Sequence, residues 1–189
     1  MFTTFAAGPA GDWQVTWQRT LCGAPLPGAS YISVARRPYF VTSAVVMPAE
    51  QWRLIGVPSH IRYAERLERE RLARVQAGLG RAEAKCAALI PIRKSEAWWA
   101  LSQDERREIF EARSHHIEGS MKFLPAIARQ LYHARDLGQP FDFLTWFEFA
   151  PEDTTRFDEL VAFLRTTPEW SFVEREVDIR LSAIPAPPI

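Results

Sequence analysis

The sequence of 189 residues lacks the features of a secreted, membrane-bound or nucleic-acid-binding protein. It contains two cysteines, Cys22 and Cys86, which are too few for a disulfide framework and are typical of a reducing compartment. No apolar stretch approaches the roughly 20 residues of a membrane-spanning helix, and the N-terminus has no basic region followed by an apolar run. Basic and acidic residues both number 23, so no net field attracts nucleic acid or an anionic membrane. We therefore expect a cytoplasmic protein that binds neither.

Motifs of the common metal centres are also missing. No HExxH, CxxC or carboxylate–histidine cluster supports a zinc or non-haem iron site. The sequence is instead rich in aromatic residues, with 7 tryptophans and 12 phenylalanines. This much aromatic surface is usual in a dense core, and it also occurs around a flat ligand.

Alternating and β-branched residues predict strands in the first half of the chain. Trp13, Val15 and Trp17 alternate with polar residues, which is the period of a half-buried strand. Further strands are predicted at 31–35, 39–46 and 52–57. The charged segment 65–79 has one thin apolar stripe and predicts a helix. Residues 1–10 are loose in composition, so we expect them to be frayed.

The second half of the chain predicts helices between strands. Ser102 can cap a helix, Glu105 completes a capping box, and the helix runs to about Ile117. A second helix is predicted at 124–138, with Pro125 in its first turn. The remaining elements are a strand at 84–92, a strand at 141–149 that is apolar on nearly both faces, a helix that starts at Asp153, and a last strand at 173–181.

This order of elements predicts an α+β fold in which helices cover one face of an antiparallel sheet. Two such halves packed together would be ferredoxin-like. We place the boundary between residues 1–83, the shortened N-terminal half, and residues 84–189, the C-terminal half.

Two adjacent histidines, His115 and His116, lie near the end of the first predicted helix. At about 100° per residue, His116 falls at the edge of the apolar stripe of Ile109, Phe110 and Ile117, whereas His115 points away. Spacing therefore favours His116 as the inward histidine. Such a residue is more often a hydrogen-bonded core histidine than a metal ligand. It is also compatible with haem, whose iron needs one proximal nitrogen.

Two longer stretches resemble a known family. They read IPIRKSEAWWALSQDERREIF and, after a histidine, FLPAIARQLYHARDLGQPFDFLTWFEF. Together they strongly resemble the chlorite dismutase family, and most closely its short-chain, dimeric branch, over roughly residues 52–181. The resemblance implies a dimeric α+β barrel with ferredoxin-like halves and one haem b per subunit, bound in the C-terminal half. It also implies a homodimer.

The same resemblance assigns the central site residues. The proximal haem ligand, and so the metal-binding residue, falls on His116, although the neighbouring His115 makes a shift of one residue possible. Glu169 corresponds to the carboxylate that accepts the other N–H of this histidine. The distal arginine falls on Arg129. Helical spacing alone does not select Arg129, because Arg135 lies nearer the apolar stripe of the second predicted helix.

Further residues acquire roles in the same way. Lys94, Trp98 and Trp99 match residues that border the haem, and Lys94 is expected near a propionate. Gln76 matches a distal glutamine that can hydrogen-bond the arginine, and Tyr63 matches a tyrosine in the same network. Without the resemblance, Lys94 would be a surface charge at a strand end, and the two tryptophans would be core or interface residues.

The implied function is that of a haem b enzyme that decomposes chlorite to chloride and dioxygen with formation of an O–O bond. One alternative is a haem peroxidase or a coproporphyrin-decarboxylating relative on the same fold. Others are a protein that carries or senses haem and a purely structural α+β barrel. Arg129 and the short N-terminal half favour the chlorite dismutase interpretation over the first alternative.

Overall fold

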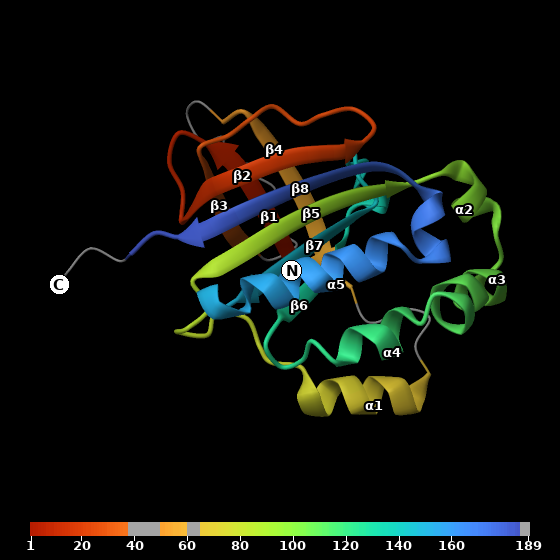
Figure 1. Cartoon of the computed structure of the whole chain (residues 1–189). Coiled ribbons are helices and arrows are strands. Elements are labelled where there is room, and N and C mark those ends of the chain that lie inside the picture. The colour runs from red at the N-terminus through yellow and green to blue at the C-terminus, as the bar shows by residue number, and fades with distance from the viewer. Residues whose placement is uncertain (38–49, 60–64, 186–189) are drawn as a thin grey trace.

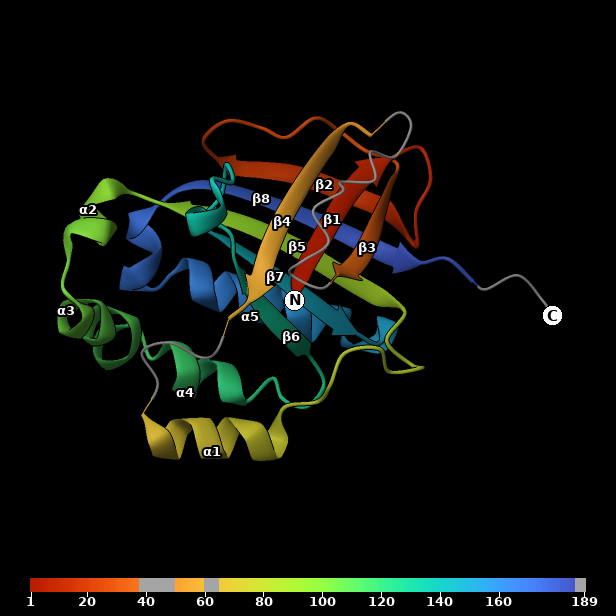
Figure 2. The same cartoon turned by 180° about the vertical axis from the view of Figure 1, so that it is seen from behind.

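The computed structural model describes residues 1–37, 50–59 and 65–185 of the chain. Eight strands from these residues form one closed antiparallel barrel (Figures 1 and 2). In chain order they are β1 (Phe2–Gly8), β2 (Trp13–Cys22), β3 (Tyr31–Arg37), β4 (Trp52–Pro58), β5 (Cys86–Lys94), β6 (Ala128–His133), β7 (Phe143–Phe149) and β8 (Val173–Ala183). Around the barrel the order is β1–β3–β2–β8–β5–β7–β6–β4, and β4 pairs with β1 to close it.

The helices gather on one side of the barrel (Figure 1). They are α1 (Arg66–Val75), α2 (Glu96–Ala100), α3 (Gln103–Arg107), α4 (His116–Met121) and α5 (Thr154–Arg165), with a π-helical segment (Glu108–Arg113) after α3 and 3₁₀ turns at Arg135–Leu137, Pro151–Asp153 and Pro168–Phe172. Within the described ranges, no helix has the length and apolarity needed to cross a membrane. The predicted α+β fold, with helices over one face of an antiparallel sheet, is confirmed.

Strand β7 shows why the predicted segment 141–149 is apolar on both faces. Leu144 and Trp146 point into the barrel and belong to its core. Phe147 and Phe149 lie on the outer face and pack against Phe157 of α5, with ring centroids 5.0 and 4.5 Å apart. A strand buried on both faces loses the usual alternation of apolar and polar residues. The outer layer between sheet and helices is therefore a second core.

The N-terminal residues are not frayed, so that prediction is wrong. β1 pairs with β3 on one side and with β4 on the other. Phe5 and Ala7 are buried inside the barrel because alternate residues of the strand face inward. The strands predicted at 31–35 and 52–57 are confirmed as β3 and β4. The strand predicted at 39–46 lies outside the described residues.

Strand β2 departs from simple alternation. Its register against β8 shifts between Val15 and Trp17. A β-bulge of this kind moves the following side chains to the other face. Trp17 is therefore 44% exposed, although the sequence places it on the same face as Trp13 and Val15.

The second helix predicted at 124–138 is wrong. Residues Ala128–His133 form strand β6, which pairs with β7 and β4. The apolar residues of this segment fit a helix or a strand, and local pattern does not separate the two. The free edges of β7 and β4 decide in favour of a strand, because pairing satisfies the backbone groups of all three segments.

The first predicted helix is only partly confirmed. Ser102 and Glu105 form the predicted capping box at the start of α3. The helix then widens into the π-helical segment, stops at Ser114, and restarts as α4 at His116. The other predicted elements are confirmed as α1, β5, α5 and β8. Asp153 lies at the N-cap of α5 but makes no side-chain capping hydrogen bond there.

Candidate functional site

A cavity of about 450 Å³ lies between the outer face of the sheet and the helices that cover it. Its walls come from β5, β6 and β7 and from α1, α4 and α5. Most of the lining side chains are apolar, such as Ile90 and Phe147 on the strands and Leu72, Ile117 and Val161 on the helices. The volume falls in the range of about 300–1,000 Å³ that is usual for ligand pockets.

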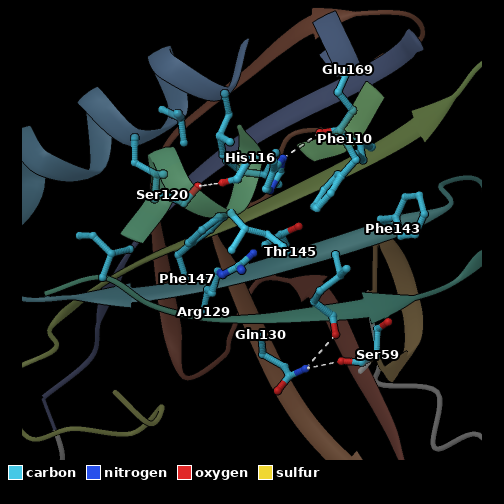
Figure 3. A pocket seen from close by; sticks show the side chains of 18 of the residues that line it. Ser59, Phe110, His116, Ser120, Arg129, Gln130, Phe143, Thr145, Phe147 and Glu169 are labelled. Atoms are coloured by element: carbon cyan, nitrogen blue, oxygen red, sulfur yellow. Dashed lines mark hydrogen bonds and ion pairs between the residues drawn. The ribbon is translucent and has the colours of Figure 1, made fainter. Parts of the chain in front are cut away.

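One wall of the cavity, the histidine wall, consists of His116, Glu169 and Lys94. His116 is the first residue of α4, and its Nδ1 lies 2.7 Å from Oε2 of Glu169 (Figure 3). The other carboxylate oxygen, Oε1, accepts a hydrogen bond of 2.8 Å from Nζ of Lys94. Glu169 is 5% exposed and Lys94 is 3% exposed. One buried carboxylate thus bridges the imidazole and the ammonium group.

The groups around Glu169 keep its carboxylate ionised. Burial alone would raise the pKa of Glu169, but the charges of His116 and Lys94 and the hydrogen bonds from both lower it to about 2. Burial lowers the pKa of Lys94, and Glu169 opposes that change. Because its partner is an ionised carboxylate, Nδ1 of His116 carries a proton. When the imidazole is neutral, the remaining ring nitrogen, Nε2, is then the one that can act as a ligand.

The break in the predicted helix separates the two histidines. His115 adopts a left-handed conformation, with φ 49° and ψ 38°, and α4 begins at the next residue. The His115 side chain is 62% exposed, whereas that of His116 is 12% exposed and lies in the cavity wall. The structure therefore places inward the histidine that spacing favoured, although the continuous helix assumed by that argument does not exist.

The opposite side of the cavity, the arginine wall, consists of Arg129 and Gln76. In Figure 3, Arg129 projects from β6 into the cavity toward the side occupied by His116. Among the residues that the structure describes, no group accepts a hydrogen bond or forms an ion pair with its guanidinium. Burial lowers the pKa of Arg129. Gln76, at the C-cap of α1, donates a hydrogen bond of 2.8 Å to the Arg129 carbonyl oxygen, which fixes the main chain of the arginine.

The strand conformation of β6 explains why Arg129 reaches the cavity. Alternate residues of a strand share a face, and Arg129, Leu131 and His133 all line the cavity. Arg135, which helical spacing favoured, lies beyond the end of β6. Its guanidinium stacks over Trp99, 3.9 Å from the ring centroid, and the residue does not line the cavity.

The two tryptophans have different surroundings. Trp98 is buried and lines the cavity, with Nζ of Lys94 lying 4.7 Å from its ring centroid. Trp99 does not line the cavity. It stacks on Phe143, with centroids 5.9 Å apart, and its indole N–H donates to Asp142 over 3.2 Å. Tyr63 lies outside the described residues.

Two supporting residues were missed by the sequence interpretation. The Ser114 hydroxyl accepts a hydrogen bond of 3.0 Å from the Glu169 main-chain N–H. Asp142 accepts a hydrogen bond of 2.7 Å from the Lys94 main-chain N–H, as well as the bond from Trp99. An acidic residue within the apolar segment 141–149 could have been recognised as a buried acceptor. No local signal identifies Ser114.

Comparison with protein families gives a decisive match. The model of the family described as chlorite dismutase matches residues 15–184. The chain belongs to the chlorite dismutase family. A curated relative, the chlorite dismutase of Ideonella dechloratans, is 34% identical over 83 residues, which make up 44% of this chain and 27% of that protein's length.

Solved structures of chlorite dismutases have the same architecture. The dimeric chlorite dismutase of Nitrobacter winogradskyi is 56% identical, with a TM-score of 0.86 over 95% of this chain and 99% of that one. The chlorite dismutase of Candidatus Nitrospira defluvii in complex with imidazole is 19% identical, with a TM-score of 0.68 over 96% of this chain and 90% of that one. This second likeness concerns the fold alone.

Proposed function

We propose that the cavity binds haem b through Nε2 of His116. The ionised Glu169 engages Nδ1 and leaves Nε2 available, and the surrounding walls are mostly apolar. In the described part of the chain, no three or more His, Cys, Asp or Glu side chains gather as a metal site. Haem suits such a cavity because the porphyrin supplies the other ligands and the protein needs to supply one nitrogen.

The reaction supported best is the decomposition of chlorite to chloride and dioxygen. The bound haem would supply the redox chemistry that amino-acid side chains lack. The chain itself would bind and orient the anion and exclude water. The catalytic contribution of the protein is therefore positional and electrostatic.

Arg129 would bind the substrate anion. Its guanidinium is charged at any physiological pH, and no described carboxylate neutralises it. A cation in an apolar cavity attracts an anion more strongly than one in water, since the local dielectric constant is lower. Arg129 would hold chlorite in the cavity while its two oxygen atoms combine, with Gln76 keeping the arginine main chain in place.

The other residues of the histidine wall would strengthen His116 as a ligand. Glu169 holds the proton on Nδ1 and makes the imidazole a stronger donor through Nε2, an effect known from other histidine-ligated metals. Lys94 keeps Glu169 ionised in a buried position. Lys94 bonds to Glu169 in the structure, and its place near a propionate stays a prediction. Trp98 and the apolar residues limit access of water.

One observation carries the proposal: Arg129 lies across the cavity from His116, which is held by Glu169. The guanidinium of Arg129 has no partner among the described residues. A protein that only carries or senses haem needs the histidine but has no use for a cation without a partner in an apolar cavity, which costs stability. An enzyme that captures an anion beside haem needs both.

We also propose that the protein acts as a homodimer, because the relative from Nitrobacter winogradskyi, with 56% identity, is described as dimeric. Ferredoxin-like halves at residues 1–83 and 84–189 remain a prediction, as does the cytoplasmic location. Within the barrel, β2 pairs with β8 and β4 pairs with β6, so the two halves would share one sheet.

The test is to load the purified protein with haem, record its absorbance spectrum, add chlorite and follow dioxygen with an oxygen electrode. We expect the spectrum of a five-coordinate histidine-ligated haem and release of dioxygen. Arg129→Ala should keep the haem and lose most of the dioxygen yield, with bleaching of the cofactor. The matched control is Arg113→Ala, which removes an exposed arginine that does not line the cavity.

The outcomes separate the alternatives. Haem binding without dioxygen from the unaltered protein would indicate a carrier or sensor, and absence of a haem spectrum would indicate a structural barrel. Normal dioxygen yield to completion from Arg129→Ala would contradict the role of the arginine.

A further inference from the structure

Because α4 begins anew at His116, its first backbone N–H groups have no acceptor within the helix. The first N–H groups of any α-helix lack an acceptor in the preceding turn. In α4 these include the N–H groups of Ile117 and Glu118, and Ile117 is 2% exposed. The usual remedy is an oxygen on the N-cap side chain, but His115 at the N-cap makes no capping hydrogen bond.

Glu111, in the preceding π-helical segment, provides the missing acceptors. Its Oε2 accepts a hydrogen bond of 2.7 Å from the Ile117 N–H, and its Oε1 accepts one of 3.2 Å from the Glu118 N–H. Its main-chain carbonyl accepts hydrogen bonds from the N–H groups of Ser114 and His115. One residue therefore holds the backbone on both sides of the break.

The conformation of the break needs such support. His115 has φ 49°, a left-handed conformation that costs free energy for a residue other than glycine and persists where its surroundings hold it. The consequence falls on the next residue, since the start of α4 sets the direction of the His116 side chain. That ring stacks on Phe110, with centroids 4.3 Å apart, and bonds to Glu169.

We propose that Glu111 is a positioning residue for haem binding: by capping α4 from the preceding helix, it directs His116 into the cavity and keeps His115 outside. This role rests on the proposed function, because it assumes that His116 is the haem ligand. Glu111 itself would not touch the haem or the substrate. It acts through the backbone of Ile117 and Glu118.

The two hydrogen bonds that Glu111 accepts predict how strongly each substitution at this position impairs haem binding. A carboxylate offers two acceptors to two N–H groups. In Glu111→Gln one acceptor remains and the amide NH₂ competes at the other position, so we expect partial function. In Glu111→Ala neither N–H has an acceptor, and α4 is free to shift at the end that carries His116.

The experiment measures haem affinity and, in the reduced haem complex, the iron–histidine stretching frequency by resonance Raman spectroscopy. We expect Glu111→Ala to bind haem about 10- to 100-fold more weakly, the usual effect of losing a group that orients a metal ligand. The iron–histidine band should broaden and move to lower frequency, because the hydrogen bond between His116 and Glu169 loosens. Glu111→Gln should lie between this variant and the unaltered protein.

Two controls separate positioning from general stability. Glu108→Ala removes an exposed acid from the same π-helical segment and should leave affinity and frequency unchanged. Ile179→Val weakens the barrel core at a residue that does not line the cavity, so it lowers stability without moving the iron–histidine band.

The proposal is overturned if Glu111→Ala keeps the normal affinity and band, or if its band stays in place as in Ile179→Val. If Glu111→Ala does not fold, Glu111→Gln alone decides by the same two measurements. Failure of the proposed function is a different result, because then the unaltered protein binds no haem or His116→Ala keeps the normal band.

Discussion

The two walls of the cavity differ in how their charges are satisfied. On the histidine wall every charged group has a partner: Glu169 is bonded to His116 and Lys94, and its main-chain N–H is bonded to Ser114. On the arginine wall the guanidinium of Arg129 has no partner among the described residues, and only its main chain is held, by Gln76.

This difference indicates that the histidine wall holds its groups rigidly in place, whereas the arginine wall is open to a ligand. A buried group that is fully hydrogen-bonded is rigid and contributes to a unique structure. A partly buried charge without a partner, such as that of Arg129, lowers stability and is available to a ligand of opposite charge. We therefore expect substitutions on the histidine wall to reduce both stability and haem binding, and substitutions on the arginine wall to reduce activity while the fold gains stability.

The largest effect is expected for the ligand itself. His116→Ala should abolish the five-coordinate histidine spectrum or the binding of haem altogether, because no other histidine in the described ranges has its Nδ1 held by Glu169. His115→Ala should leave the spectrum unchanged, since that side chain is mostly exposed. Absorbance titration with haem measures both, and the reverse result would move the ligand by one residue.

Removal of Glu169 should cause the largest loss of stability. Glu169→Ala removes the ion-pair partner of the buried Lys94 ammonium group, and breaking a buried pair typically costs about 3–5 kcal/mol. The measurement is the free energy of unfolding in urea for the haem-free protein. The double variant Lys94→Met/Glu169→Leu should recover most of this loss, because it removes both charges. If the double variant is as unstable as the single one, the unpaired charge is not the cause.

Acid should weaken the histidine wall of the haem-free protein. The pKa of Glu169 falls from 4.5 to about 2 on folding, so its contribution is complete above pH 4.5 and is lost as the pH falls toward 2. At about 1.4 kcal/mol per tenfold change in proton affinity, the difference corresponds to roughly 3 kcal/mol. Glu169→Gln should lose less stability than the unaltered protein over this range. The measurement is the free energy of unfolding in urea at several pH values. If it falls in parallel for the two proteins, Glu169 is not the group responsible.

The smallest effect, and the one of opposite sign, is expected on the arginine wall. Arg129→Met replaces a partly buried cation by an apolar side chain of similar length and should stabilise the haem-free protein by about 1 kcal/mol, as often happens when a functional residue is removed. Thermal unfolding measures this change. A loss of stability equal to that of Glu169→Ala would mean that the two walls do not differ in the way described.

Sequence pattern predicted the elements whose local signal agrees with their surroundings. The capping box of Ser102 and Glu105 and the strand buried on both faces, 141–149, are found as predicted. Pattern failed where pairing across the barrel decides, as in β1 and β6, because a short apolar segment does not reveal whether a sheet edge is open beside it.

The site residues, too, were predicted only in part. Resemblance to a family named His116, Glu169, Lys94 and Arg129, and the structure brings all four to one cavity. It does not bring Trp99 there. The helix over which spacing favoured His116 is interrupted at Ser114 and His115, so the inward histidine was predicted from a continuous helix that does not exist.

The amino-acid sequence by itself determined the α+β class, the family and the residue types available for a haem site, since these depend on composition, local period and motif. The tertiary structure alone showed how His116 comes to face inward and how Arg129 reaches the cavity. The direction of His116 depends on a break that Glu111 holds across six residues. The direction of Arg129 depends on strand pairing with β7 and β4. Both are set by hydrogen bonds between segments, which a local pattern does not contain.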